Sequence, residues 1–195
     1  TSLTPTQARH LAAWRRDPII ATDNDPAGHK AAERDYWLLA AHGRDPRAPH
    51  LPTTHDPASI FTTYGPDILA KDLDRSAPLA DRLLHPILTA HDQATPEDIA
   101  HLIAARPAGT WHAATQAAAK ALNLDPDTLA RHVIHAANAW TDDPARAADR
   151  RLAAPLAQPA GRPTRPASGN PTRPVPYSGT PGPTDRARSA DVPGR

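Results

Sequence analysis

The stretch over residues 17–34 constrains the fold of this chain more than any other. A short apolar run at residues 19–21 is followed by two carboxylates, Asp23 and Asp25. Pro26 comes next, and proline is typical of the first position of a helix. This order predicts a buried strand of the parallel type, then an acidic turn, then a helix.

The two carboxylates of the turn predict a metal site. Residues two apart in an extended segment share a face, so Asp23 and Asp25 are expected to point the same way at the carboxyl edge of a sheet, where open α/β sheets bind ligands. Adjacent carboxylates repel each other unless a cation lies between them, and hydrated Mg²⁺ (or Mn²⁺) is a common solution. The alternative interpretation is structural, with Asp25 as the N-cap of the helix and Asp23 as a polar strand end.

Repeated Thr-Pro and Asp-Pro pairs predict the starts of most helices. Gln7 completes a capping box with Thr4 at the first of them. Gly43 is expected to end the helix after the acidic turn in a left-handed conformation, and Gly28 to permit a close approach of the backbone to a sheet or ligand, or else to be a tolerated small residue. A second strand is expected over residues 47–51, and helices over about 5–16, 27–42, 57–65, 66–73, 77–91, 96–106, 110–122, 126–140 and 144–152.

The last part of the chain has a different composition. The segment 155–195 holds 10 of the 24 prolines, five of the nine glycines, and six arginines against two aspartates. Its net charge of +4 leaves −3 for the rest, since the whole chain carries +1. We expect a disordered tail over residues 154–195, because so few apolar side chains cannot offset the loss of chain entropy. Its Arg-Pro repeats are either simply solvated or contact nucleic-acid phosphates without specificity.

Several function classes lack support in the sequence. The chain has no cysteine for disulfides or thiolate metal sites, no apolar run near the roughly 18 residues of a membrane span, and no signal peptide, so we expect a cytoplasmic protein.

The chain has no methionine, which suggests a processed or excerpted sequence. His132 and His135 share a helix face without a third ligand, and surface or half-buried positions are expected for both. No hydrolase triad, phosphate-binding glycine loop or zinc-protease motif is present.

The acidic turn and the segments after it follow a family pattern. Asp23-Asn24-Asp25-Pro26-Ala27-Gly28, with Ala31 and Arg34, resembles the Asp-x-Asp turn of the Toprim domain of primases, topoisomerases and related nucleases. The order Leu51-Pro52, Asp56-Pro57, Tyr64-Gly65 and Ala77-Pro78-Leu79 resembles the Toprim half of a bacterial-type DNA primase. Residues 110–129 are similar to the helical region that follows it. The resemblance covers roughly residues 1–135.

This resemblance implies a set of site residues. Asp23 and Asp25 correspond to the paired metal carboxylates, and Asp56 to the first carboxylate of the next acidic loop. The sequence departs from the family at Ala58, where a second aspartate is frequent, and at Asn24, where glycine is usual. The Toprim glutamate belongs to a strand upstream of residue 1, and neither Glu33 nor Glu97, both on later helices, replaces it.

The expected fold class is therefore α/β. We expect a partial Toprim domain over residues 1–84, with a Rossmann-like parallel sheet and flanking helices, then an all-helical region over 85–153 and the disordered tail. The resemblance implies metal-dependent nucleotidyl transfer for RNA primer synthesis in DNA replication, with single-stranded DNA and nucleotides as partners, although this chain alone is expected to be inactive. The alternative is a non-catalytic remnant or interaction module whose helices bind a replication partner such as a helicase.

Overall fold

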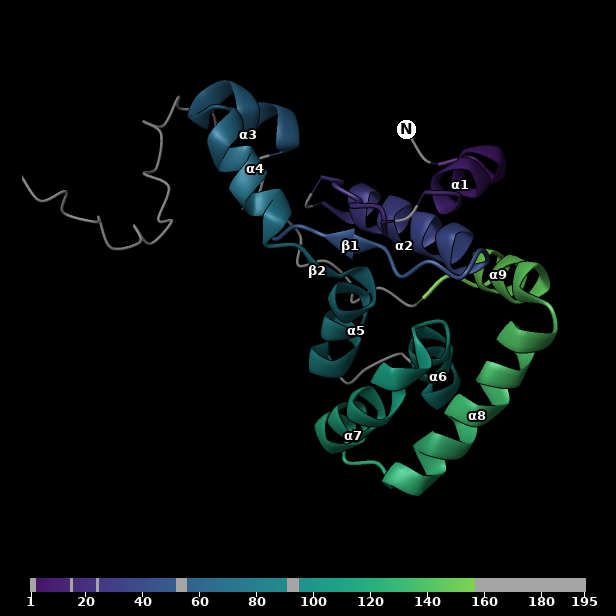
Figure 1. Cartoon of the computed structure of the whole chain (residues 1–195). Helices are drawn as coiled ribbons and strands as arrows, with labels where there is room; N and C mark the ends of the chain where they lie inside the picture. Colours follow the sequence, from purple (N-terminus) through teal and green to yellow (C-terminus); the bar gives the residue numbers. More distant parts are fainter. Residues whose placement is uncertain (1–2, 15, 24, 52–55, 91–94, 157–195) are drawn as a thin grey trace, which may run out of the picture. The chain divides into compact units, whose positions relative to one another are not determined.

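The computed structural model describes residues 3–14, 16–23, 25–51, 56–90 and 95–156 (Figure 1). From position 157 onward the predicted tail, with its Arg-Pro repeats, lies outside these residues. Asn24 of the acidic turn also lies outside them. The described residues all fall within one compact unit of the chain. The predicted domain boundaries at residues 84/85 and 153/154 stay predictions.

Nine α-helices lie within the described part of the chain. A single-turn 3-10 helix, η1 (Ala108–Thr110), precedes the seventh of them. Their bounds agree closely with the sequence prediction: α1 Pro5–Ala12, α2 Pro26–Ala40, α3 Pro57–Tyr64, α4 Pro66–Asp74, α5 Leu79–Ala90, α6 Pro96–Ala104, α7 Trp111–Leu122, α8 Pro126–Asp142 and α9 Pro144–Ala153.

Local capping explains where the helices begin. Thr4 accepts a hydrogen bond from the backbone N of Gln7, whose side chain accepts one from the backbone of Thr4 in return, as predicted for α1. Thr95 and Asp125 cap α6 and α8 in the expected positions. Gly43 follows α2 with φ of 69°, which confirms the predicted left-handed conformation.

The predicted parallel sheet was wrong. The described residues hold only two strands, β1 (Arg47–Ala48) and β2 (Ala77–Pro78), and they pair antiparallel. The predicted strand at residues 19–21 is reduced to one parallel bridge between Ile19 and Arg47. Two backbone hydrogen bonds hold this bridge, Ile20 N to Arg47 O at 2.7 Å and Arg47 N to Pro18 O at 2.9 Å.

Proline and exposure explain why no larger sheet forms. Pro46 and Pro49 bracket β1, and Pro78 ends β2, so each segment lacks the N–H donors that a longer ladder needs. Ile19 is 42% exposed while Ile20 packs against the core, so the apolar run has one buried face instead of two. The expected α/β class is therefore replaced by a mostly helical fold.

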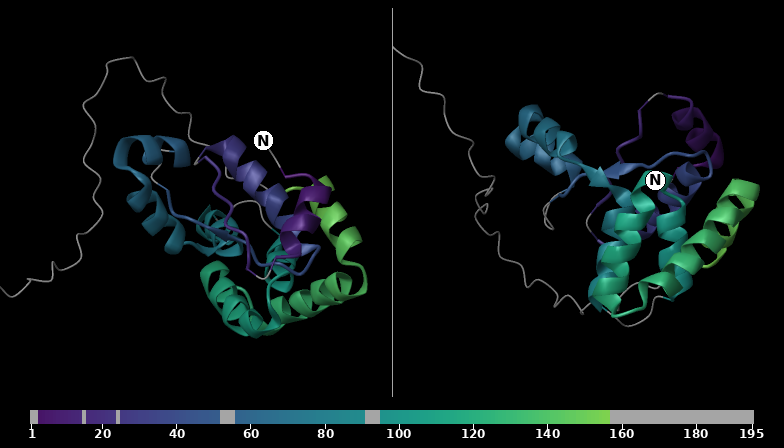
Figure 2. Two further views of the ribbon diagram at one scale, coloured as in Figure 1. Left: turned by 45° about the horizontal axis from the view of Figure 1, so that its top comes forward. Right: turned by 60° about the horizontal axis from the view of Figure 1, so that its bottom comes forward.

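The main core forms around α2, which carries the acidic turn at its N-terminus. Tyr36 and Trp37 of α2 are fully buried, and the Tyr36 hydroxyl donates to the Leu102 carbonyl of α6 at 3.2 Å. The Trp37 ring stacks on Trp140 of α8, with centroids 5.8 Å apart. Figures 1 and 2 show α6, α7 and α8 side by side, and all three contribute to the same apolar cluster. These later helices therefore support the helix that begins at the acidic turn.

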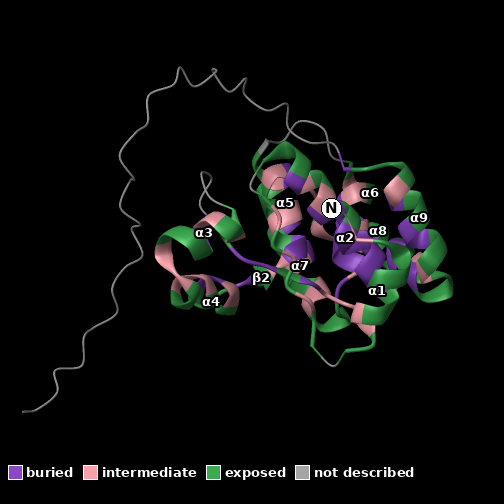
Figure 3. Cartoon of the chain, turned by 90° about the horizontal axis from the view of Figure 1, so that it is seen from above, coloured by how far each residue is buried: buried purple, intermediate pink, exposed green. Residues whose placement is uncertain are grey.

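Two short helices, α3 and α4, pack on each other. Most of their surface is exposed or half-buried, whereas α2 is largely buried (Figure 3). Ile60 is their one fully buried large apolar side chain among the described residues, and Phe61 beside it is 54% exposed. None of the described helices is long and apolar enough to cross a membrane.

Candidate functional site

The acidic turn is fixed at the start of α2 by its second carboxylate. The Asp25 Oδ1 atom accepts a hydrogen bond from the Gly28 backbone N at 2.6 Å, so Asp25 is the N-cap of the helix. The structural interpretation of Asp25 is confirmed. This bond engages Oδ1 and the side chain is exposed, so a metal-binding role is compatible with the cap.

Gly28 also constrains the backbone of Asp23, the first acidic residue of the turn. A Cβ atom placed on Gly28 would lie 2.1 Å from the carbonyl oxygen of Asp23 and 2.8 Å from its carbonyl carbon. Any side chain here would push the turn away from the helix. A close approach at Gly28 is thus confirmed, but the backbone that it meets belongs to the turn itself and not to a sheet or a ligand.

The third predicted metal ligand caps the next helix. Asp56 Oδ1 accepts from the Ser59 backbone N at 2.6 Å, and Ser59 Oγ accepts from the Asp56 backbone N at 2.9 Å. Asp23, Asp25 and Asp56 are all exposed. Within the described ranges, no three His, Cys, Asp or Glu side chains are gathered closely enough to hold one metal ion. The structure therefore does not gather the three predicted aspartates into one metal centre, and their metal-binding role stays a prediction.

The carboxylate oxygens of the turn are of the ligand type that Mg²⁺ prefers. Mg²⁺ prefers oxygen ligands and commonly keeps several waters while one or two carboxylates and substrate phosphates hold it. Asp23 and Asp25 are two such carboxylates in a backbone that Gly28 and the Asp25 cap hold in place. The residues present therefore fit a weakly held, hydrated ion.

A cavity beside the turn contains residues that the sequence analysis missed. It has a volume of about 460 Å³ and is formed by His29 of α2, the paired strands β1 and β2, residues 49–51 and α5. We call it the His29 cavity. Burial lowers the pKa of His29, nearby Arg82 lowers it further, and Asp25 acts in the opposite direction. The abundance of histidine, 11 residues, was the only signal in the sequence.

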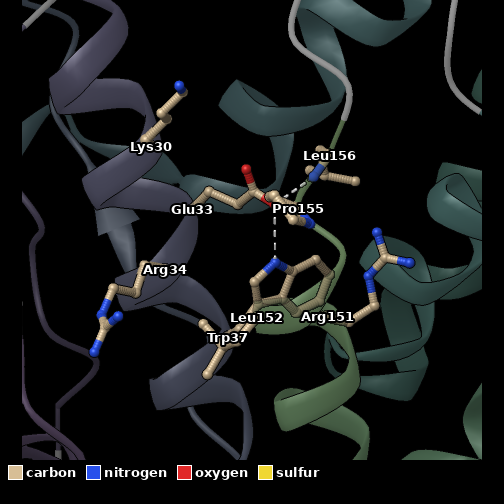
Figure 4. A pocket seen from close by; sticks show the side chains of 8 residues that line it. All are labelled: Lys30, Glu33, Arg34, Trp37, Arg151, Leu152, Pro155 and Leu156. Carbon is tan, nitrogen blue, oxygen red and sulfur yellow. Dashed lines mark hydrogen bonds between the residues drawn. The ribbon is translucent and has the colours of Figure 1, made fainter.

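A second cavity, of about 450 Å³, lies between α2, α9 and the residues that follow α9 (Figure 4). The buried Glu33 carboxylate accepts hydrogen bonds from Leu156 N at 2.7 Å and from Trp37 Nε1 at 3.3 Å. Lys30 and Arg34 extend away from this carboxyl group. Burial raises the pKa of Glu33, against the effect of these two hydrogen bonds. Glu33 thus ties the chain after α9 to α2.

Arg151 completes this attachment of α9. Its guanidinium lies over the Trp37 ring, 5.6 Å from the centroid, and Nη2 donates to Asp98 Oδ1 of α6 at 2.7 Å. Burial raises the pKa of Asp98, but hydrogen bonds from Thr95 and Arg151 outweigh burial and hold the pKa below its usual value. The polar groups of the second cavity are therefore largely used within the fold. His132 and His135, by contrast, are exposed on α8, as expected.

Comparison with known proteins shows that the fold is similar to part of a DNA primase. The sequence matches no protein-family model and no curated protein. The chain is similar to a crystal structure of the zinc-binding and RNA polymerase domains of the Aquifex aeolicus primase, with a TM-score of 0.52 and 21% identity, over 66% of this chain and 32% of that one. A DNA primase domain from Pseudomonas aeruginosa gives a TM-score of 0.47 and 22% identity, over 69% of this chain and 46% of that one.

The chain thus spans about a third of the length of the Aquifex structure. This likeness shows a fold shared with part of a primase, and to that extent the predicted resemblance is confirmed. The more specific assignment to the Toprim domain stays a prediction.

Proposed function

We propose that this chain is part of a DNA primase-like protein, and that its acidic turn takes part in metal-dependent nucleotidyl transfer during RNA primer synthesis. The observation that carries the proposal is the built geometry of the turn. Gly28 lies against the Asp23 backbone and Asp25 caps α2, so two exposed acidic residues are restrained at the N-terminus of this largely buried helix. The fold shared with part of a primase supports it.

In this proposal the carboxylates Asp23 and Asp25 supply oxygen ligands for Mg²⁺ or Mn²⁺. A bound divalent ion would offset the charge of nucleotide phosphates during transfer. The contact of Gly28 with the Asp23 backbone and the cap made by Asp25 restrain both residues at the start of α2, which matters because phosphoryl transfer depends on positioning. The resemblance adds Asp56, which is exposed at the start of α3 and which the structure does not gather with Asp23 and Asp25 into one group of ligands.

The alternative is a non-catalytic module that binds a replication partner. One observation favours it, since the described residues contain no group of three potential metal ligands. The two glutamates of the chain do not supply a third ligand at the turn. Glu33 is buried and bonds to Trp37 and Leu156, and Glu97 is exposed on α6 beside His101. We therefore expect primer synthesis by this chain alone, assayed on single-stranded DNA with labelled nucleotides, to stay at background.

The proposed site is tested by nucleotide binding. We expect ATP to bind more tightly with Mg²⁺ than in EDTA, because the ion bridges the carboxylates and the phosphates. Asp23→Asn combined with Asp25→Asn should abolish this gain, since asparagine keeps the helix cap but carries no charge. Asp125→Asn, at the cap of α8, is the matched control and should leave the gain unchanged. An equal gain in all three proteins would contradict the proposed site.

A further inference from the structure

The His29 cavity lies next to the acidic turn. His29 is on the first turns of α2, and its backbone N donates to the Asp25 carbonyl at 2.9 Å. Opposite it, α5 contributes Arg82 and His85, and His50 follows β1. The cavity volume, about 460 Å³, falls in the range of small-molecule sites. A ligand in this cavity would therefore be close to whatever the acidic turn holds.

The charge of the cavity favours an anion. Arg82 is half-buried, and burial lowers the pKa of its guanidinium, but an arginine stays protonated at neutral pH. Asp81 is the one acidic residue among the described residues that line the cavity, and its Oδ1 accepts from Arg106 Nη1 at 2.7 Å. Arg106 lies outside the lining and offsets the negative charge of Asp81. With Arg106 counted and the histidines neutral, the two arginines and Asp81 sum to a net charge of +1.

The histidines are arranged for a group larger than a metal ion. His29, His50 and His85 all line the cavity, yet no three potential metal ligands converge on one point in the described part of the chain. A single ion would need them about 2 Å from its centre. Imidazole N–H groups spread around a cavity instead suit a polyatomic anion with several oxygens, which arginine also binds well.

We propose that the His29 cavity binds a phosphate group of a nucleotide or of a nucleic-acid strand, with Arg82 supplying the charge and the three histidines supplying hydrogen bonds. The inference deepens the proposed function by naming the groups that would hold a phosphate beside the acidic turn. It does not depend on the metal, because Arg82 and the histidines need no divalent ion to bind phosphate.

Calorimetric titration in EDTA tests the proposal on the full chain, with ATP as one probe and a short oligothymidylate as the other. We expect binding of at least one probe, and Arg82→Gln should weaken it by about tenfold or more, the effect of losing a charge-assisted hydrogen bond. Arg75→Gln is the matched control, because it removes the same charge from an exposed position at the end of α4. His50→Gln and His85→Gln alter exposed side chains and should each weaken binding a few-fold without unfolding the chain.

The outcomes separate this inference from the proposed function. Binding of ATP alone identifies a nucleotide site, and binding of the oligonucleotide identifies a strand site. The cavity is supported if binding in EDTA persists in the double variant Asp23→Asn with Asp25→Asn but is lost in Arg82→Gln. This holds even if Mg²⁺ does not increase the affinity for ATP. No binding of either probe in EDTA overturns the inference, as does an equal loss in Arg82→Gln and Arg75→Gln.

Discussion

Gly28 lies against the backbone of Asp23 so closely that a Cβ atom on residue 28 would stand 2.1 Å from the Asp23 carbonyl oxygen. Real Cβ atoms are not found so near to a backbone oxygen. The glycine therefore couples the start of α2 to the acidic turn, and the position of Asp23 depends on the absence of a side chain at residue 28.

Gly28→Ala should both destabilise the fold and weaken metal binding. The added methyl group must displace the Asp23 backbone, and we expect a loss of about 1–3 kcal/mol in the free energy of unfolding. Gly109→Ala is the matched control, because a Cβ there meets nothing within 4 Å. Urea denaturation of both variants checks this prediction. Equal stability of the two would mean that the turn can move aside without cost.

Asp25 is expected to have two separable roles. Asp25→Ala removes the cap of α2 and should cost about 0.5–2 kcal/mol of unfolding free energy, whereas Asp25→Asn keeps a capping side chain and should cost much less. Both substitutions should weaken Mn²⁺ binding, because both remove the charge. Asp125→Ala removes the cap of α8 and should lower stability alone. Retention of full Mn²⁺ affinity in Asp25→Asn would leave only the capping role.

The pH dependence of stability should report the buried Glu33. Burial raises its pKa in the folded chain above 4.5, so the protonated form favours folding. Its contribution is present below pH 4.5 and is lost as the pH rises through the raised pKa. Glu33→Gln keeps an acceptor for Trp37 and Leu156 and does not titrate. Its free energy of unfolding relative to that of the wild type should therefore increase from about pH 4 to pH 7.

Thermal denaturation at several pH values measures this difference. Glu97→Gln is the control, since the Glu97 side chain is 71% exposed, and it should follow the wild type. A constant difference between Glu33→Gln and the wild type across this pH range would show that the carboxyl group does not titrate as its burial indicates.

The stacked tryptophans should carry much of the attachment between α2 and the later helices. Trp140→Ala removes the ring that stacks on Trp37 and should cost about 3–5 kcal/mol of unfolding free energy. Trp14→Ala is the matched control, because Trp14 is 67% exposed, and should change stability by less than about 0.5 kcal/mol. Similar losses in both variants, measured by urea denaturation, would contradict this account of the core.

The sequence predicted the helices well and the sheet poorly, for physical reasons. Capping at Thr4, Thr95 and Asp125 depends on residues three positions apart, so it can be read locally. Strand pairing joins distant segments, and the apolar run that includes Ile19 did not reveal that one of its faces would be exposed. The prolines around β1 were the missed signal, because they remove ladder donors.

The candidate site, too, could be predicted only where its signal is local in the sequence. Asp23 and Asp25 stand out because their spacing is local, and the proline after them marks a helix start. The His29 cavity could not be predicted, because Arg82 and His29 are brought together only when α5 packs beside α2. The buried position of Glu33 likewise depends on Leu156, which is 123 residues away.

Paramagnetic line broadening by Mn²⁺ tests the central claim most directly. In ¹⁵N-labelled chain, sub-stoichiometric Mn²⁺ should broaden the amide signals of residues around the acidic turn first, those near Asp23, Asp25 and Gly28. The broadening should disappear in Asp23→Asn with Asp25→Asn and persist in Asp125→Asn. Broadening that centres elsewhere, or that survives the double substitution, would contradict the assignment of this turn as the metal-binding site.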